Sequence, residues 1–338
     1  MDNLISLIAE IKARIDKGKF EGLSKDEALI LSELPVSLYT AIFDLSTQIN
    51  SKTRKKVDKC GSFYSDVSPC AEDCAFCPFS HDHYTSLNLE QQTSEILIEN
   101  MLKYADRIAA LGINHFKIVS TGLRADDAHI EKVCEGIVAV KLKHPNLQIC
   151  VSMGLLSESN LLKLREAGAD FYNNNLETSE KHFNKIISSH TLQQKIDVIR
   201  LAKRMGYSIC SGGIFGVGEN LKERIDLFFL IKELKVESSP FNIFVRYDNI
   251  PLSSMVGEKQ ISTLEIFLSL AFFRLVYPQC RIVLGGGRDF YLSEMEQEFA
   301  LLVGATALQS SNALNAKGTI DRIIKDDKLF NNVLNENE

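Results

Sequence analysis

The chain has 338 residues, a length that fits either two ordinary domains or one α/β barrel with extensions. Hydrophobic residues make up 45% of it and charged residues 24%, which excludes disordered and fibrous proteins because the apolar surface suffices for a large core. The 38 Lys and Arg residues are outnumbered by 44 Asp and Glu residues, and the net charge of -6 excludes nucleic acid as the main partner.

The sequence indicates neither a membrane-spanning segment nor a secretion signal. The most apolar run, 264–276, is shorter than the roughly 20 residues that span a bilayer and contains Glu265 and Arg274. Charged side chains interrupt the apolar ones at the N-terminus, so a signal peptide is not indicated. We therefore expect a cytoplasmic protein without a membrane span. The 8 Cys residues are too sparse for a disulfide scaffold, which makes clustered ones candidates for metal or redox sites.

The predicted elements begin with residues 1–50, a helical extension in which Leu4, Ile8 and Ile11 share one face. From residue 57 onward, β-branched runs alternate with amphipathic stretches, as in parallel α/β proteins. The eight predicted strands are 57–64, 115–121, 148–153, 171–176, 208–215, 241–246, 281–284 and 307–311.

Seven helices are predicted between these strands: 93–111, 128–143, 158–166, 192–205, 221–234, 263–277 and 294–302. Several of them are followed by Gly, which helix C-termini prefer. The eight strand–helix alternations predict a TIM-type (β/α)8 barrel over residues 51–325, with a doubly wound sheet as the alternative. Residues 326–338 are expected to form a C-terminal tail.

Three cysteines follow the first predicted strand as Cys-x3-Cys-x2-Cys: Cys70, Cys74 and Cys77. Three thiolates at this spacing can hold three irons of a 4Fe-4S cube and leave the fourth iron without a protein ligand. A zinc site is the alternative, but structural zinc takes a fourth Cys or His at close spacing. His81 and His83 are near enough to supply it, although a loop position is the better interpretation of both.

Together with later segments, this motif resembles the radical S-adenosylmethionine (SAM) enzymes, specifically their biotin synthase branch, over roughly residues 50–320. The resemblance rests on segments 70–77, 154–159, 172–178, 210–214, 216–219 and 285–288. In such enzymes the open iron chelates SAM, and an electron cleaves it to methionine and a 5'-deoxyadenosyl radical that removes hydrogen from an unactivated carbon. The resemblance implies that the protein positions this carbon and excludes water.

The resemblance also assigns cofactor contacts. Phe76 stands where the family has an aromatic residue beside adenine, and Asn175 and Glu177 stand where it binds the ribose and methionine ends of SAM. Lys195 replaces the usual Arg at the methionine carboxylate, so a bidentate contact has become a point charge.

Four further residues are assigned in the same way. Gly216 and Gly218 are implied to let the backbone approach adenine closely. Asn173 and Asn242 match positions that hydrogen bond the ureido ring of dethiobiotin. Capping of turns or strand ends is the alternative role of these two Asn residues.

Biotin synthases carry an auxiliary iron–sulfur cluster that supplies the sulfur atom. Cys150 and Cys210 match two of its ligands, each inside a strand whose alternate side chains face inward. The family's other Cys and its Arg ligand align with Lys117 and Val283. Because Cys60 lies in the first strand, we expect Cys60, Cys150 and Cys210 to form a rearranged auxiliary site. Three ordinary buried cysteines are the alternative.

Substrate recognition departs further from the family. Asn315 and Ala316 replace the paired Thr residues that bind the valeryl carboxylate. We predict sulfur insertion that converts dethiobiotin to biotin, with a two-component lipoyl synthase acting on octanoyl chains as the runner-up. A radical isomerase or hydrogenase maturase without sulfur insertion is a third interpretation, and an electron-transfer iron–sulfur protein a fourth. The last would leave segments 173–177 and 216–219 without a role.

The expected partners follow from this chemistry. They are a small-molecule or acyl-chain substrate and a reducing protein such as flavodoxin or ferredoxin. The sequence is also compatible with a homodimer.

Overall fold

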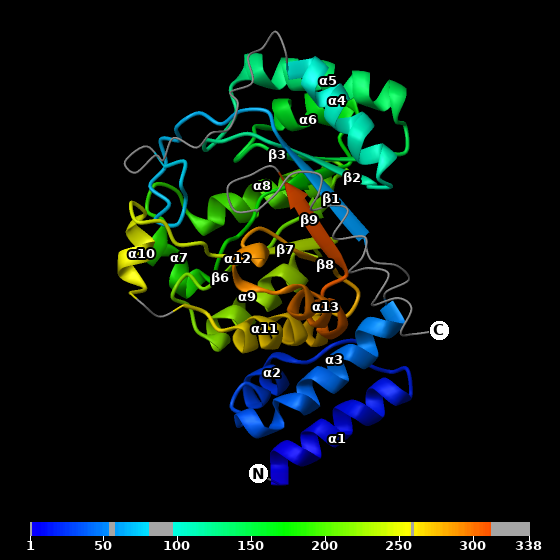
Figure 1. Cartoon of the computed structure of the whole chain (residues 1–338), viewed down its shortest axis with the longest axis vertical. Helices are drawn as coiled ribbons and strands as arrows, with labels where there is room; N and C mark the ends of the chain where they lie inside the picture. The colour runs from blue at the N-terminus through cyan, green and yellow to red at the C-terminus, as the bar shows by residue number, and fades with distance from the viewer. Residues whose placement is uncertain (1, 54–57, 81–96, 258–259, 312–338) are drawn as a thin grey trace.

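The computed structural model describes residues 2–53, 58–80, 97–257 and 260–311. Its strands are parallel and form one barrel surrounded by helices (Figure 1). They are β1 (Asp58–Tyr64), β2 (His115–Val119), β3 (Gln148–Ser152), β4 (Phe171–Asn173), β5 (Ser208–Cys210), β6 (Gly213–Phe215), β7 (Ser238–Ile243), β8 (Arg281–Leu284) and β9 (Ala307–Ser311). The order is β5-β4-β3-β2-β1-β9-β8-β7-β6, and a β5–β7 pairing closes the barrel. The predicted TIM-type fold is confirmed.

Strands β5 and β6 share one barrel position, for which the sequence pattern predicted the single strand 208–215. β5 pairs with β4 at Asn173 and Cys210, whereas β6 pairs with β7. Between the two strands, a Cβ atom at Gly212 would lie 1.8 Å from the carbonyl oxygen of Pro240. The backbones approach so closely here that only Gly fits, and regular pairing is interrupted.

Ten helices follow β1 in the described part of the chain. They are α4 (Leu97–Ala110), α5 (Asp127–Lys143), α6 (Glu158–Ala167), α7 (Glu180–Ile186), α8 (Leu192–Arg204), α9 (Leu221–Glu233), α10 (Pro251–Met255), α11 (Thr263–Val276), α12 (Arg288–Tyr291) and α13 (Glu294–Val303). Helices α8, α9, α11 and α13 begin with capping boxes, in which two backbone N–H groups at the helix start find side-chain acceptors. The short helices α7, α10 and α12 were not predicted, because such lengths hold too few residues for a periodic pattern.

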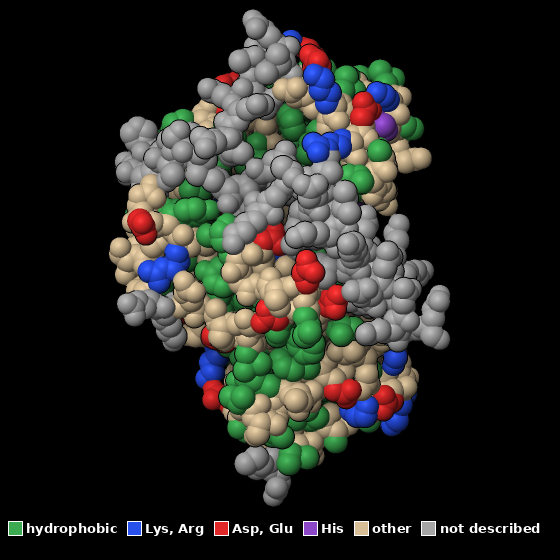
Figure 2. All heavy atoms as spheres, in the orientation of Figure 1, with side chains coloured by type: hydrophobic (Ala, Val, Ile, Leu, Met, Phe, Trp, Pro, Cys, Tyr) green, Lys and Arg blue, Asp and Glu red, His purple; other side chains and the backbone are tan. Residues whose placement is uncertain are grey.

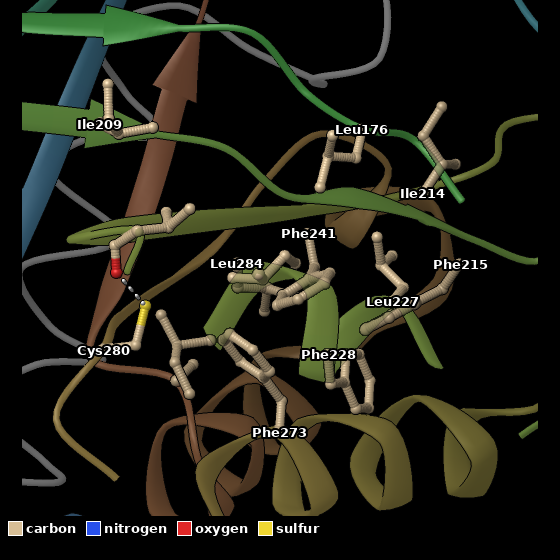
Figure 3. Close-up of a cluster of buried hydrophobic side chains, with 14 of the residues drawn as sticks. Leu176, Ile209, Ile214, Phe215, Leu227, Phe228, Phe241, Phe273, Cys280 and Leu284 are labelled. Carbon is tan, nitrogen blue, oxygen red and sulfur yellow. Dashed lines mark hydrogen bonds between the residues drawn. The ribbon is translucent and has the colours of Figure 1, made fainter. Parts of the chain in front are cut away.

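Aromatic rings fill the space between strands β6 to β8 and helices α9 and α11. The rings of Phe215 and Phe241 stack with centroids 4.8 Å apart. Phe228 and Phe273 meet Phe241 edge-on at 5.6 and 4.9 Å, and Figure 3 shows these rings pointing toward one another. The thiol of Cys280 donates to a backbone carbonyl oxygen at 3.6 Å in the same core. Cys280 therefore contributes to packing outside the barrel.

The segment 1–50, predicted as an N-terminal helical extension, holds α1 (Asp2–Asp16), α2 (Lys25–Leu31) and most of α3 (Tyr39–Thr53). These helices form a layer beside α11 and α13 (Figure 1). Ser46 Oγ donates to the carbonyl oxygen of Val303, and Asn50 Nδ2 donates to that of Leu301 at 2.7 Å. Both contacts satisfy carbonyl groups at the C-terminal end of α13. The predicted tail 326–338 lies outside the described residues.

No clear membrane span is found in the part of the chain that the structure describes. No single helix there combines the length and hydropathy of a span, although the bent pair Lys25–Leu31 and Val36–Thr53 would pass by length and composition together. Figure 2 shows acidic and basic side chains interspersed over the face in view. The described residues of this face thus offer no continuous positive surface of the kind that binds nucleic acid.

Candidate active site and cluster sites

A cavity of about 330 Å³ lies at the C-terminal ends of the barrel strands, beside the loop that follows β1. Active sites of α/β barrels occupy this end. Nine of the predicted site residues line it: Cys70, Cys74, Phe76, Cys77, Asn173, Asn175, Glu177, Lys195 and Asn242. Residues from several strand–loop junctions and from helix α8 therefore meet at one place.

The cysteine loop directs backbone groups toward its own sulfur atoms. The N–H of Glu72 donates to Cys70 Sγ at 3.5 Å, and the backbone N–H groups of Phe79 and Ser80 donate to the thiol of Cys77. Burial raises the pKa of all three thiols, that of Cys77 to about 11, and backbone N–H donors partly oppose this at Cys70 and Cys77. Because thiolates are the metal-binding form, iron binding must drive their deprotonation.

A site for a single metal ion is not formed by the described residues. No three His, Cys, Asp or Glu side chains among them converge on one point as the ligands of a single metal ion would. An iron–sulfur cube instead takes one thiolate for each ligated iron. His81 and His83, the residues considered for a zinc site, lie outside the described part of the chain.

Glu177 is the most constrained residue of the cavity. Its φ of 70° is in the left-handed region that non-Gly residues rarely adopt. Its Oε2 atom is buried and has no hydrogen-bond partner among the described residues. Burial raises the pKa of Glu177, and the positive charge of Lys195 opposes that rise. A buried acceptor without a protein donor fits a ligand that carries hydroxyl or ammonium groups, as SAM does.

Lys195 reaches this cavity from helix α8. Its Nζ atom donates to Oδ1 of Asn174 at 3.2 Å, and Asn174 Nδ2 donates to the hydroxyl of Tyr172 at 3.1 Å. Asn174 was not predicted as a site residue, although it stands between two residues that were. These hydrogen bonds fix the direction of a buried ammonium group toward the cavity.

The two Asn residues predicted to bind the substrate differ in how much of their amide is engaged. Asn173 Oδ1 accepts from Ser152 Oγ at 2.9 Å, and its Nδ2 donates to the carbonyl oxygen of Cys210 at 2.8 Å. Asn242 Oδ1 accepts from the N–H of Gly286 at 2.8 Å. No hydrogen bond of Asn242 Nδ2 is found within the described residues, so this donor is available to a ligand.

Gly216 and Gly218 do not line the cavity. Both have positive φ, 87° and 96°, in the turn before α9. The carboxylate of Glu219 accepts from the N–H of Gly216 at 2.9 Å and from Nε of Arg224 at 2.6 Å. The turn conformation explains both glycines, and their predicted contact with adenine remains a prediction.

A second, smaller cavity lies toward the N-terminal ends of the strands. Cys60, Cys150 and Cys210, the three cysteines predicted to form an auxiliary site, all line it. A hydrogen bond between two of these thiols raises the pKa of Cys150 and lowers that of Cys210. Burial raises the pKa of Cys60 to about 11. Three strands thus bring three thiols to one space inside the barrel.

Arg281, which was not predicted as a site residue, also lines the smaller cavity. It precedes Val283 by two residues on β8, so both side chains point to the same side of the strand. Arg281 Nε donates to Asp58 Oδ2 at 2.9 Å and its Nη1 to Ser238 Oγ at 3.0 Å. Its Nη2 is buried without a partner among the described residues. Three thiols and one unpaired cationic donor fit an anionic iron–sulfur group.

Two family models match the chain: the Radical SAM superfamily over residues 67–231 and the Biotin and Thiamin Synthesis associated domain over residues 240–328. The fold agrees with solved structures. Methylornithine synthase superposes with a TM-score of 0.74 at 19% identity, covering 91% of this chain and 87% of that one. The FeFe-hydrogenase maturase HydG from Carboxydothermus hydrogenoformans superposes at 0.76 with 16% identity, covering 97% and 80%. With the Cys70 to Cys77 loop at the barrel mouth, these findings make the chain a radical SAM enzyme.

Sequence relatives identify the family to which the chain belongs within the radical SAM enzymes. The biotin synthase of Caldicellulosiruptor bescii is 33% identical over 315 residues, which is 93% of this chain and 91% of the relative. The biotin synthase of Methanococcus aeolicus is 33% identical over 308 residues, covering 90% and 91%. The chain belongs to the biotin synthase family. Membership implies a 4Fe-4S cluster, SAM and an auxiliary cluster, which confirms the predicted cofactors.

Proposed function

We propose that this enzyme inserts sulfur at unactivated C–H carbons and converts dethiobiotin to biotin, with the sulfur coming from an iron–sulfur group held by Cys60, Cys150 and Cys210. The observation that carries the proposal is the convergence of these three thiols on one cavity inside the barrel. Lys117 and Gln309 line both this cavity and the larger one, so the two spaces are neighbours. A substrate between them would face the radical source on one side and the sulfur source on the other.

The chain's own residues bind and orient the reactants. Cys70, Cys74 and Cys77 hold three irons, and the buried Oε2 of Glu177 and the ammonium group of Lys195 hold the polar end of SAM. When bound, these groups supply the radical that removes a hydrogen atom and the sulfide that the carbon takes up. Enclosure of the reacting carbon within the barrel keeps water from it.

Dethiobiotin is supported by the two Asn residues of the larger cavity. The free Nδ2 donor of Asn242 suits the ureido carbonyl oxygen. Asn173, whose amide is fixed by hydrogen bonds, lies on β4, which only the β5–β6 position separates from the β7 strand of Asn242. Asn315 and Ala316, which raised the octanoyl alternative, lie outside the described residues. The octanoyl chain is therefore the competing substrate in the isotope experiment.

The proposal also covers the setting of the reaction. A reducing protein such as flavodoxin or ferredoxin supplies the electron that SAM cleavage needs. A cytoplasmic location suits free thiols, and all eight cysteines are free in the structure. A homodimer remains a prediction.

An isotope experiment tests the sulfur source and the substrate together. The enzyme is reconstituted anaerobically with 34S-sulfide, incubated with dethiobiotin or with an octanoylated carrier protein, and the products are read by mass spectrometry. We expect 34S in biotin. A labelled lipoyl product would show that the substrate is the octanoyl chain and not dethiobiotin. A sulfur-free rearranged product would refute sulfur insertion.

The matched control is Cys134→Ala. Cys134 is a half-buried thiol on α5 and lines neither cavity. Its replacement should leave label transfer unchanged, whereas Cys150→Ala should abolish label transfer while 5'-deoxyadenosine formation continues. Equal label transfer in both variants would show that the barrel thiols are ordinary core residues.

A further inference from the structure

Lys117 lies in the wall between the two cavities. It is the third residue of β2 and stands in register with Ser62 of β1 and Cys150 of β3. Its side chain lines both the larger cavity and the three-thiol cavity, and only 9% of the residue's surface is exposed. Lys117 is therefore a buried residue whose charged end belongs to the interior of the barrel.

The ammonium group of Lys117 has neither a hydrogen bond nor an ion pair with any residue that the structure describes. Burying a cation without an acceptor is strongly unfavourable, so buried charges are normally paired or bound to a ligand. An unpaired ammonium group that lines enclosed space inside the barrel therefore indicates a partner that the chain itself does not supply.

The other basic side chains near the barrel interior already have partners, although Nη2 of Arg281 remains free. Arg281 contacts Asp58 at 2.9 Å, and His115 Nε2 donates to the same carboxylate at 2.8 Å. Lys195 donates to Asn174, and its charge is the largest of those that offset burial of the Glu177 carboxyl. Among the basic side chains that line these two cavities, Lys117 is thus the one whose charged group has neither a hydrogen bond nor an ion pair with the described residues.

The missing negative charge is accounted for by the three-thiol site. Lys117 lines the same cavity as Cys60, Cys150 and Cys210, and its strand β2 pairs with β1, which carries Cys60, and with β3, which carries Cys150. The core of an oxidised iron–sulfur cluster carries two positive charges, and three thiolates carry three negative ones. One negative charge therefore remains, and one cation faces it without a partner.

We propose that Lys117 is the counter-ion of the iron–sulfur group at Cys60, Cys150 and Cys210, donates hydrogen bonds to it, and thereby raises its reduction potential. This inference rests on the function proposed above. Lys117 is a positioning and charge-balancing residue in this account and binds no iron. Reduction adds an electron to an already anionic group, so a nearby positive charge favours the reduced state.

The test uses full-length protein, reconstituted anaerobically, with Lys117→Met and Lys117→Arg as variants. Met removes the charge at similar length, and Arg keeps it. Iron and acid-labile sulfide are counted, and the midpoint potential is measured by a redox titration followed by electron paramagnetic resonance. The signal of the second cluster is identified by its loss in Cys60→Ala. Lys132→Met, at an exposed ion pair on α5, is the control.

We expect the midpoint of the second cluster to fall in Lys117→Met, with a reduced-to-oxidised ratio about tenfold lower at a given potential, equivalent to about 59 mV for one electron. Lys117→Arg should remain near the wild-type value, and the SAM-binding cluster should keep its signal in every variant. Loss of the second cluster in Lys117→Met but not in Lys117→Arg would also support the charge requirement.

Other outcomes overturn the inference and separate it from the proposed function. An unchanged potential in Lys117→Met, with a raised KM for the substrate, would assign Lys117 to a substrate anion instead. Loss of the second cluster in both variants would indicate a packing role. A wild-type protein that binds only one cluster would refute the proposed function, and the counter-ion with it.

Discussion

Glu72 and His190 are 118 positions apart in the sequence, yet His190 Nδ1 donates to Glu72 Oε2 over 2.6 Å. The next residue, Asp73, accepts from the backbone N–H groups of Ser188 and Ser189, each at 3.0 Å. The loop that carries Cys70, Cys74 and Cys77 is thereby attached to the segment that leads into α8, the helix of Lys195. These contacts fix the position of the cysteine loop, assigned to the cluster, relative to Lys195, which is assigned to SAM.

Asp73→Ala should loosen the cysteine loop. We expect the free energy of unfolding to fall by about 1 kcal/mol, because the loop is partly exposed and water replaces some of the lost hydrogen bonds. Urea denaturation of the full-length protein measures this, with Asp44→Ala on α3 as the control. Faster loss of iron from the variant during gel filtration should accompany it.

The same contact predicts a pH dependence. Burial raises the pKa of Asp73, but hydrogen bonds from Ser188 and Ser189 outweigh it and place the pKa well below the usual range. A carboxylate with a lowered pKa contributes stability above its unfolded value of about 3.9, and this contribution is lost as the pH falls further. The difference between wild type and Asp73→Ala should stay constant from about pH 8 to 5 and shrink below about pH 4. A difference that shrank near neutral pH would contradict this assignment.

Replacing Cys70, Cys74 or Cys77 by Ala should abolish reductive cleavage of SAM. Each thiolate holds one iron, and a cube that lacks one protein ligand loses the geometry that leaves a single iron open. The measurement is 5'-deoxyadenosine formed with dithionite as reductant, with Cys134→Ala as the matched control. Full product formation by any of the three variants would refute the assignment.

Glu177→Gln and Lys195→Met should each weaken SAM binding about ten- to a hundredfold, since a hydrogen bond to a charged group contributes about 1.5 to 3 kcal/mol. Anaerobic calorimetric titration of the reconstituted protein measures the affinity. Burial raises the pKa of Glu177, so its ionisation opposes folding once the pH exceeds the unfolded value of about 4.3. Glu177→Gln should therefore raise the Tm of the SAM-free protein at neutral pH while lowering affinity. Unchanged affinity in both variants would mean that SAM is held elsewhere.

The triple variant of Cys60, Cys150 and Cys210 to Ala should lose the iron of the second cluster and keep about four iron atoms of the first. Iron analysis with Mössbauer spectroscopy of 57Fe-reconstituted protein measures both. Since these thiols lie in the smaller cavity and the first three in the larger one, the two losses should be independent. Wild-type iron content in the triple variant would show that these cysteines are ordinary core residues that bind no cluster.

The sequence alone determined the barrel, and it also predicted the three-cysteine loop as the first cluster site. Alternating strand and helix periodicities are local properties, and so is the spacing of Cys70, Cys74 and Cys77, because a few residues of one loop decide it. Strand alternation also predicts an inward direction for Cys150 and Cys210, since alternate side chains of a strand share one face. What these predictions share is that each depends on neighbours within one turn or one strand.

Tertiary structure decided the relationships between distant segments. The break at Gly212 depends on the approach of Pro240, and the attachment of the cysteine loop depends on His190. The neighbourhood of Lys117 depends on strand register and barrel closure, which join residues of β1, β3 and β5 around one space. Burial and charge pairing arise only when the barrel closes, because both depend on which side chains exclude water from one another. Periodicity therefore predicted where a side chain points, and only the closed barrel determined what it meets there.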